Sequence, residues 1–214
     1  MLVAIGDSIT DGSGSTRDQN ERWTDFLVRR LQQEKGLQLG VINAGIGGNR
    51  MLHDDSGPQL LARFDRDVLE RPGVTHALVL VGVNDLGRLH RGSAETADTR
   101  RAMLADLQAG WRELVRKAHA LGVCVIAGTL TPYGASTLYK PEPFNEADRQ
   151  SMNQWLRSAD NVDAAVRDQS APDRLRAEFD SGDHLHLSPA GYRAMAAAVA
   201  VDRLTACNPR SLAK

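Results

Sequence analysis

The stretch LVAIGDSITDG, residues 2–12, opens the chain with a short apolar run that ends at Gly6. An apolar run bounded by glycine predicts a buried strand, and the polar turn after it would carry Ser8 to the edge of a sheet. Ser8 is therefore a candidate nucleophile. The same residues also fit an ordinary strand-to-helix turn, because Gly, Asp and Ser favour turns for conformational reasons. The rest of the chain has to decide between these two interpretations.

Size and charge restrict the class of protein. The chain has 214 residues, of which 42% are hydrophobic and 25% charged, which suits one domain with a substantial core. The net charge of -1 gives no electrostatic basis for binding nucleic acid. We expect a small-molecule partner. No apolar run approaches membrane-spanning length, and no signal peptide precedes the first strand, so a soluble chain is expected, cytoplasmic or secreted after removal of a signal.

The two cysteines are too few for a disulfide framework. Cys124 lies within an apolar run, where a cysteine usually acts as a small core residue. We therefore expect Cys124 to be buried and to have no role in chemistry.

Apolar runs of strand length alternate with longer segments of helical period, which is typical of βαβ units and a parallel sheet. Strands are predicted over residues 2–5, 39–44, 76–83, 123–130 and 162–166, and helices around residues 23–35, 60–69, 94–120, 146–158 and from Ser188 onward. We predict a single α/β domain over residues 1–214. It would be a flavodoxin-like three-layer α/β/α sandwich with a five-stranded parallel sheet in the order 2-1-3-4-5.

In such a sheet, ligands bind beyond the carboxyl ends of the strands, at the point where the strand order reverses. Polar groups that follow the first three strands would therefore converge there: Ser8, the glycine-rich turn at residues 45–48, and Asn84. A further polar cluster, residues 180–186, lies between the predicted fifth strand and the last helix. It would reach the same end of the sheet.

Four short blocks lie at the ends of predicted strands or in the loop before the last helix: GDSIT at residues 6–10, NAGIGGN at residues 43–49, GVND at residues 82–85 and DHLH at residues 183–186. Their order and spread resemble the four blocks of the SGNH (GDSL-type) hydrolases. By this resemblance Ser8 is the nucleophile, His186 the general base and Asp183 the residue that orients His186. The oxyanion hole would consist of the backbone N–H groups of Ser8 and Gly48 and the side-chain amide of Asn84.

These residue types suit acyl transfer. A serine hydroxyl needs a base to remove its proton, and an Asp three residues before a His allows one loop to present both side chains. Gly48 would let an acyl group approach its backbone, although a left-handed turn would also explain a glycine there. His184 competes with His186 as the base, and the Asp-x-x-His spacing favours His186.

Three other interpretations remain open. Asp183, His184 and His186 could bind a metal, but that would leave Ser8 and Asn84 without a role. Gly45-x-Gly47 partly matches a dinucleotide motif, but Arg50 stands in place of the third glycine. A binding module without activity could also use this fold.

The expected function is a serine esterase that forms an acyl-enzyme intermediate and needs no cofactor or metal, as the resemblance implies. The segments that could wall the site, residues 86–93 and 132–143, contain few aliphatic side chains. Tyr133 and Tyr139 could offer flat faces to a sugar, or could simply anchor the loop. We therefore expect a short acyl ester, such as an acetyl ester, on a carbohydrate. A lipase, lysophospholipase or thioesterase activity is the alternative.

Overall fold

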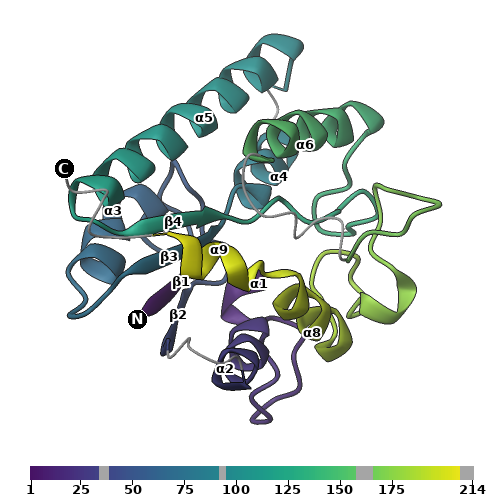
Figure 1. The fold of residues 1–214 in the computed structure, drawn as a ribbon. Coiled ribbons are helices and arrows are strands. Elements are labelled where there is room, and N and C mark those ends of the chain that lie inside the picture. The colour runs from purple at the N-terminus through teal and green to yellow at the C-terminus, as the bar shows by residue number, and fades with distance from the viewer. Residues whose placement is uncertain (34–38, 92–94, 158–165, 208–214) are drawn as a thin grey trace.

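The computed structural model describes residues 1–33, 39–91, 95–157 and 166–207, and its centre is a parallel β-sheet (Figure 1). The four strands within these ranges are hydrogen-bonded in the order β2-β1-β3-β4. Their bounds are β1 Leu2–Gly6, β2 Val41–Gly45, β3 His76–Leu80 and β4 Cys124–Ala127. Every residue of β1 and β3 is buried, as expected for central strands covered on both faces.

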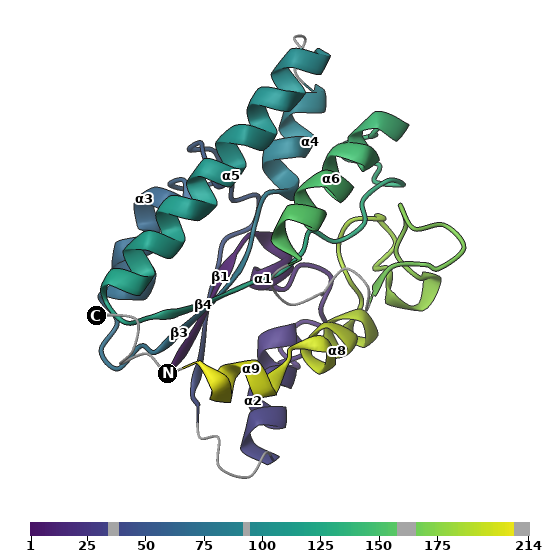
Figure 2. The same ribbon diagram turned by 45° about the horizontal axis from the view of Figure 1, so that its top comes forward.

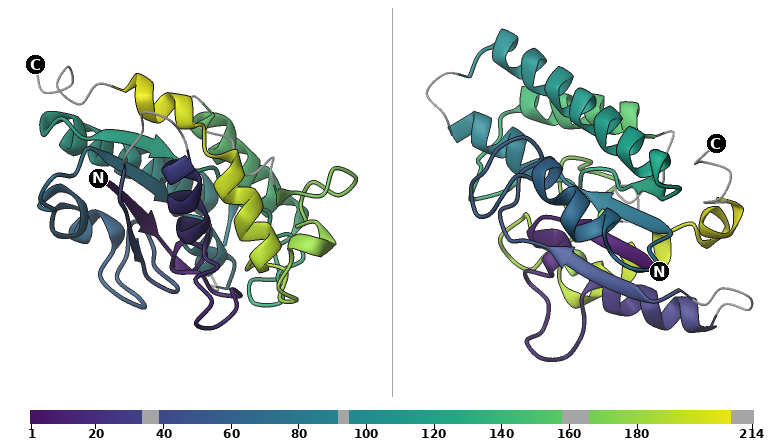
Figure 3. Two further views of the ribbon diagram at one scale, coloured as in Figure 1. Left: turned by 60° about the horizontal axis from the view of Figure 1, so that its bottom comes forward. Right: turned by 90° about the vertical axis from the view of Figure 1, so that its left-hand side faces the viewer.

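Helices cover both faces of the sheet, which makes three layers (Figures 1 and 2). One face is covered by α2 (Trp23–Gln33), α8 (Pro189–Ala198) and α9 (Val201–Ala206). The other face is covered by α3 (Leu60–Phe64), the π-helical turn η1 (Asp65–Leu69) and α5 (Ala97–Ala120). The two views of Figure 3 show the sheet between these layers.

The predicted strand order is confirmed for the first four strands. The predicted fifth strand, residues 162–166, lies outside the described residues except for Val166, which the structure does not assign to a strand. The α/β class and the parallel sheet are therefore established, whereas the five-stranded form is not observed.

Local sequence accounts for the helix starts. Ser188 precedes Pro189 and its hydroxyl accepts a hydrogen bond from the Gly191 N–H, which makes it an N-cap followed by proline at the first helical position. Thr96 starts α5 with a capping box, in which its hydroxyl and that of Thr99 each accept a backbone N–H of the other residue. No helix in the described ranges is both long enough and apolar enough to cross a bilayer.

One predicted connection is helical. The third strand ends at Leu80, and α4 (Val83–Arg91) begins almost at once, so most of the expected loop over residues 86–93 is a helix. The next helix after β4, α6 (Pro143–Leu156), begins a few residues earlier than predicted and buries Arg149 and Asn153 among its apolar side chains.

The expectation for the cysteines is wrong in one respect. Cys124 is buried, as predicted, but it forms a disulfide with Cys207, at a Cα–Cα distance of 6.3 Å. The helix α9 brings Cys207 to the amino end of β4, and the Leu204 carbonyl lies 3.0 Å from the His76 imidazole at the start of β3. A pair separated by 83 residues depends on this tertiary contact, which the local pattern does not reveal.

We expect Cys207→Ser to lower the free energy of unfolding by about 2–5 kcal/mol, because the bridge restricts the unfolded chain over a long loop. Denaturant unfolding with and without reductant measures this. Reductant should bring the wild type to the stability of Cys207→Ser and leave that variant unchanged. Equal stabilities of the oxidised wild type and the variant would contradict a stabilising bridge.

Candidate active site

Ser8 lies where β1 passes into the short helix α1 (Ser8–Asp11), at the carboxyl end of the sheet (Figure 1). The N-cap of α1 is Asp7, whose carboxylate accepts the backbone N–H of Ile9 at 3.0 Å. The Ser8 side chain is nearly buried, with 7% of the residue exposed. The first strand and its capped turn thus fix the backbone that carries the hydroxyl.

The carboxyl of Asp7 is enclosed beneath this turn. Burial raises the pKa of Asp7 to about 7, against the opposing effect of the Ile9 N–H, and the nearby Asp85 adds to the increase. Asp85 likewise organises a loop through the backbone, since its carboxylate accepts the Met51 N–H at 2.9 Å.

A hydrogen-bonded chain connects Ser8 with the loop before α8. The His186 Nε2 atom lies 2.8 Å from the Ser8 hydroxyl, and the His186 Nδ1 atom lies 2.5 Å from a carboxylate oxygen of Asp183. The three residues predicted from the sequence are therefore brought together across 178 positions of the chain. In this arrangement Nδ1 donates to the carboxylate, which leaves Nε2 free to accept the serine proton.

The Asp183 carboxylate is fixed by its own loop. Its Oδ1 atom accepts the backbone N–H groups of Leu185 at 3.0 Å and of His186 at 2.8 Å. Partial burial acts to raise the pKa of Asp183, but these bonds and the His186 side chain lower it to about 2. The carboxylate is therefore ionised at neutral pH and oriented toward the imidazole.

His184 belongs to a separate pair. Its Nδ1 atom lies 2.5 Å from Asp180, and its side chain is about half exposed. Its backbone has a φ of +61°, in the left-handed region. The two histidines of this loop therefore have different partners: His186 contacts Ser8, and His184 pairs with Asp180.

Asn84 lies at the start of α4 and is buried, with 2% exposed. Its amide nitrogen donates to the Asn49 carbonyl at 2.8 Å, which connects Asn84 to the glycine-rich turn after β2. Because Gly6 and Gly45 are paired in register at the ends of β1 and β2, this turn leaves the sheet beside the Ser8 turn. The predicted donors therefore gather at one edge of the sheet.

Gly48 has a φ of +72°, a conformation that favours glycine. A side chain at this position would also meet Ser56, whose hydroxyl would lie 2.5 Å from the added carbon. The turn and this contact account for the glycine, without an approaching acyl group.

Sequence analysis did not identify Arg63, which joins the ends of β1 and β2 and the turn that follows β2. Its guanidinium donates to the Gly6 carbonyl at 2.9 Å, to the Ala44 carbonyl at 2.8 Å and to the Asn49 side chain at 2.8 Å. Its charge is balanced by Asp67 at 3.0 Å. The sequence feature that could have indicated this buried arginine is its place on the apolar face of a predicted helix, with an aspartate four residues later.

The interpretation of Tyr133 and Tyr139 as flat faces for a sugar is wrong, because both side chains are buried, at 1% and 4% exposed. The Tyr133 hydroxyl lies 3.0 Å from the His90 imidazole, and the Tyr139 hydroxyl donates to the Asn84 side-chain oxygen at 2.6 Å. Both tyrosines anchor the segment instead, which was the other interpretation of their role.

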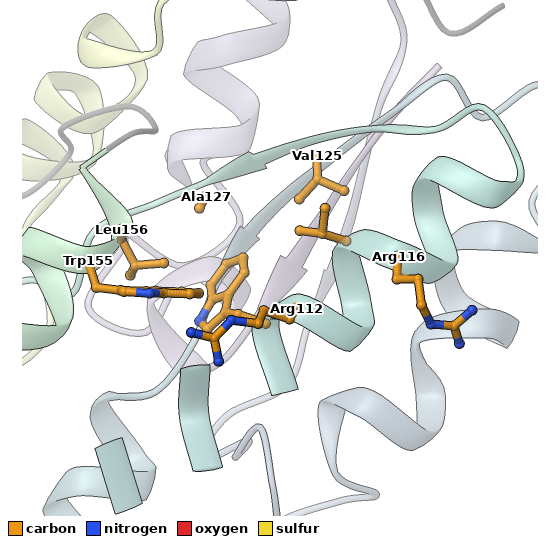
Figure 4. A pocket seen from close by; sticks show the side chains of 8 residues that line it. Arg112, Arg116, Val125, Ala127, Trp155 and Leu156 are labelled. Atoms are coloured by element: carbon orange, nitrogen blue, oxygen red, sulfur yellow. The ribbon is translucent and has the colours of Figure 1, made fainter. Parts of the chain in front are cut away.

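A pocket of about 580 Å³ lies apart from these residues, between α5, α6 and β4 (Figure 4). Trp111, Val125 and Trp155 line its apolar part. The central carbon of the Arg112 guanidinium lies 5.3 Å from the centroid of the Trp155 ring. None of the predicted site residues lines it. In the part of the chain that the structure describes, no group of three His, Cys, Asp or Glu side chains could hold a metal ion.

Solved structures with the same fold include esterases and a lipase. An aryl esterase from M. smegmatis has a TM-score of 0.71 and 15% identity, covering 96% of this chain and 98% of its own. A GDSL-like lipase from Bacteroides thetaiotaomicron has a TM-score of 0.66 and 18% identity, covering 95% and 86%. An acetylxylan esterase from Geobacillus stearothermophilus has a TM-score of 0.58 and 22% identity, covering 92% and 90%. At these identities the likeness establishes the fold alone.

Comparison with curated protein sequences found no significant match. A family model described as the GDSL-like Lipase/Acylhydrolase family matches residues 4–194. This span includes all four sequence blocks and most of the fold. The chain therefore belongs to the GDSL-like lipase/acylhydrolase family, the SGNH hydrolases, and is an acylhydrolase.

Proposed function

We propose that the protein is a serine esterase that cleaves short-chain acyl esters through an acyl-enzyme intermediate. Ser8 is the nucleophile, His186 the general base and acid, and Asp183 the residue that orients and stabilises the imidazole. The observation that carries this proposal is the unbroken hydrogen-bonded chain from Asp183 through His186 to the Ser8 hydroxyl.

In the first half of the reaction, His186 removes the proton of the Ser8 hydroxyl as the oxygen attacks the ester carbonyl carbon. The tetrahedral intermediate collapses when the imidazolium protonates the leaving alcohol, which produces the acyl-serine. Water, deprotonated by the same imidazole, then attacks the acyl group, and Ser8 recovers its proton as the acid leaves. Asp183 remains ionised throughout and stabilises the imidazolium, which its low pKa supports.

The oxyanion of both tetrahedral intermediates is stabilised by the backbone N–H groups of Ser8 and Gly48 and by the amide of Asn84. The hydrogen bond from Asn84 to Asn49 supports this role, because it ties the amide to the turn that carries Gly48. Such donors are effective because the fold positions them before charge develops, and each contributes about 3–4 kcal/mol in the transition state.

The preference for a short acyl group is supported by the few aliphatic side chains in the two segments that were expected to wall the site, residues 86–93 and 132–143. Of these side chains, Leu86 is buried within α4, and Leu138 is exposed. The apolar pocket between α5 and α6 contains no predicted site residue. A long acyl chain gains only about 0.8 kcal/mol for each buried CH₂ and needs a continuous apolar wall to do so.

A carbohydrate is the proposed alcohol portion of the ester. The buried tyrosines no longer support it, and the remaining support is the fold shared with an acetylxylan esterase. A lipid or thioester substrate is the competing proposal, since the structural neighbours also include a GDSL-like lipase.

We expect kcat/KM to fall along the series of acetyl, butyryl, octanoyl and palmitoyl esters of one alcohol. The physical reason is that the additional CH₂ groups of a longer acyl chain would stay exposed to water and would add no binding free energy. Steady-state hydrolysis below the critical micelle concentration measures the series. A rise toward the octanoyl ester would contradict the short-acyl proposal, and a comparison of acetylated xylose with ethyl acetate would then test sugar recognition.

A further inference from the structure

A buried tyrosine lies directly behind the Asn84 carboxamide. The Tyr139 hydroxyl donates to the Asn84 Oδ1 atom at 2.6 Å, while the Asn84 Nδ2 atom donates to the Asn49 carbonyl at 2.8 Å. A carboxamide nitrogen carries two hydrogens. With the oxygen held by one partner and one N–H held by the other, a single N–H is left for a ligand.

The ring of Tyr139 is held against the helix that carries Asn84. A carbon added to Gly87, one turn after Asn84 on α4, would lie 2.5 Å from atoms of the ring. The rings of Tyr139 and Tyr133 pack edge to face, with their centroids 6.3 Å apart. The backbone N–H of Tyr139 donates to the Ser136 hydroxyl at 3.3 Å. The hydroxyl therefore has one position relative to Asn84.

The direction of the bond between the two side chains follows from the same surroundings. The Asn49 carbonyl can only accept, so Nδ2 of Asn84 must face it and Oδ1 must face Tyr139. Burial raises the pKa of the Tyr139 hydroxyl, so it keeps the proton that it donates to Oδ1. This bond withdraws electrons from the amide and makes the remaining N–H a stronger donor.

We propose that Tyr139 is a positioning residue for ester hydrolysis, which fixes and polarises the Asn84 carboxamide so that its free N–H meets the developing oxyanion. This inference rests on the proposed role of Asn84 in the oxyanion hole. Tyr139 touches no reacting atom and acts only through Asn84. The segment over residues 132–143 thus contributes to catalysis from behind the site and not as a wall for substrate.

The test is Tyr139→Phe, which removes the hydroxyl and keeps the ring against Gly87. We expect kcat for an acetyl ester to fall about 3- to 10-fold, as for the loss of one buried hydrogen bond, with KM unchanged within about twofold. The matched control is Tyr133→Phe, since this hydroxyl is also buried on the same segment but bonds to His90. Its kcat should remain within about twofold of the wild type.

A double-mutant cycle separates positioning from general damage to the fold. In an Asn84→Ala background, Tyr139→Phe should have no further effect on kcat, because the group on which it acts is gone. Gly87→Ala provides a second approach, since its methyl group displaces the ring without altering Tyr139, and it should lower kcat at least as far as Tyr139→Phe.

The outcomes distinguish the two proposals. If Asn84→Ala itself keeps the wild-type kcat, the oxyanion role of Asn84 fails, and the role of Tyr139 fails with it. If Asn84→Ala loses activity but Tyr139→Phe does not, only the inference about Tyr139 is overturned. Equal losses in the two Tyr→Phe variants, or the same fold-loss from Tyr139→Phe with and without Asn84, would also overturn it.

Discussion

Replacing Ser8 with alanine is expected to lower kcat/KM for an acetyl ester by about 10³–10⁶-fold and to leave the fold intact. The Ser8 hydroxyl lies 2.8 Å from the His186 imidazole. Among the described residues, no other hydroxyl is hydrogen-bonded to that imidazole. The change removes a single atom from a nearly buried residue. Steady-state kinetics and circular dichroism of the purified variant measure the two expectations.

Covalent labelling provides an independent measurement of the same role. A fluorophosphonate should modify the wild type at Ser8, as identified by mass spectrometry, and should not modify Ser8→Ala. Ser13→Ala is the matched control, since it removes a hydroxyl from the turn beyond α1 and should keep both labelling and turnover. A folded Ser8→Ala protein with near wild-type turnover would show that the nucleophile is another group.

The second large effect is expected at His186. Its alanine variant should lose about 10³–10⁶-fold in kcat/KM, because no other base contacts the Ser8 hydroxyl within the described residues. His184→Ala is a stringent control two residues away, since that side chain pairs with Asp180 and is about half exposed. We expect it to lose less than about tenfold.

Comparing the two histidine variants on one acetyl ester assigns the base. The Asp183 carboxylate remains in both variants, and its bonds to the backbone N–H groups of residues 185 and 186 do not depend on either imidazole. Loop structure should therefore survive both changes. Equal losses, or a greater loss in His184→Ala, would show that the base has been assigned to the wrong residue.

Features determined by short-range patterns could be predicted from the sequence. The apolar run before Gly6, the buried run that became β3 and the Ser-Pro start of α8 each set local backbone preferences that packing did not override. The resemblance of four short blocks to a family predicted Ser8, Asn84, Asp183 and His186 as site residues. The fold brings Ser8, Asp183 and His186 into one hydrogen-bonded chain.

Features that depend on contacts between distant segments could not be predicted in this way. The loop expected after the third strand became α4, because Gly82, with a φ of +127°, turns the chain directly from β3 into the helix. Tyr133 and Tyr139 looked suited to an exposed loop, yet their partners, His90 and Asn84, lie about 50 residues earlier in the chain. Composition alone cannot say which side of a loop faces the core.

The sequence by itself determined the family, the α/β class and the spacing that lets one loop carry both Asp183 and His186. Only the tertiary structure decided that Arg63 joins the turns after β1 and β2, that Cys124 pairs with Cys207, and that the Tyr139 hydroxyl donates to Asn84. The physical reason is the range of the forces involved. Periodicity, capping and turn preference act over a few residues, whereas a buried guanidinium or phenol finds its partners only when separate elements pack together.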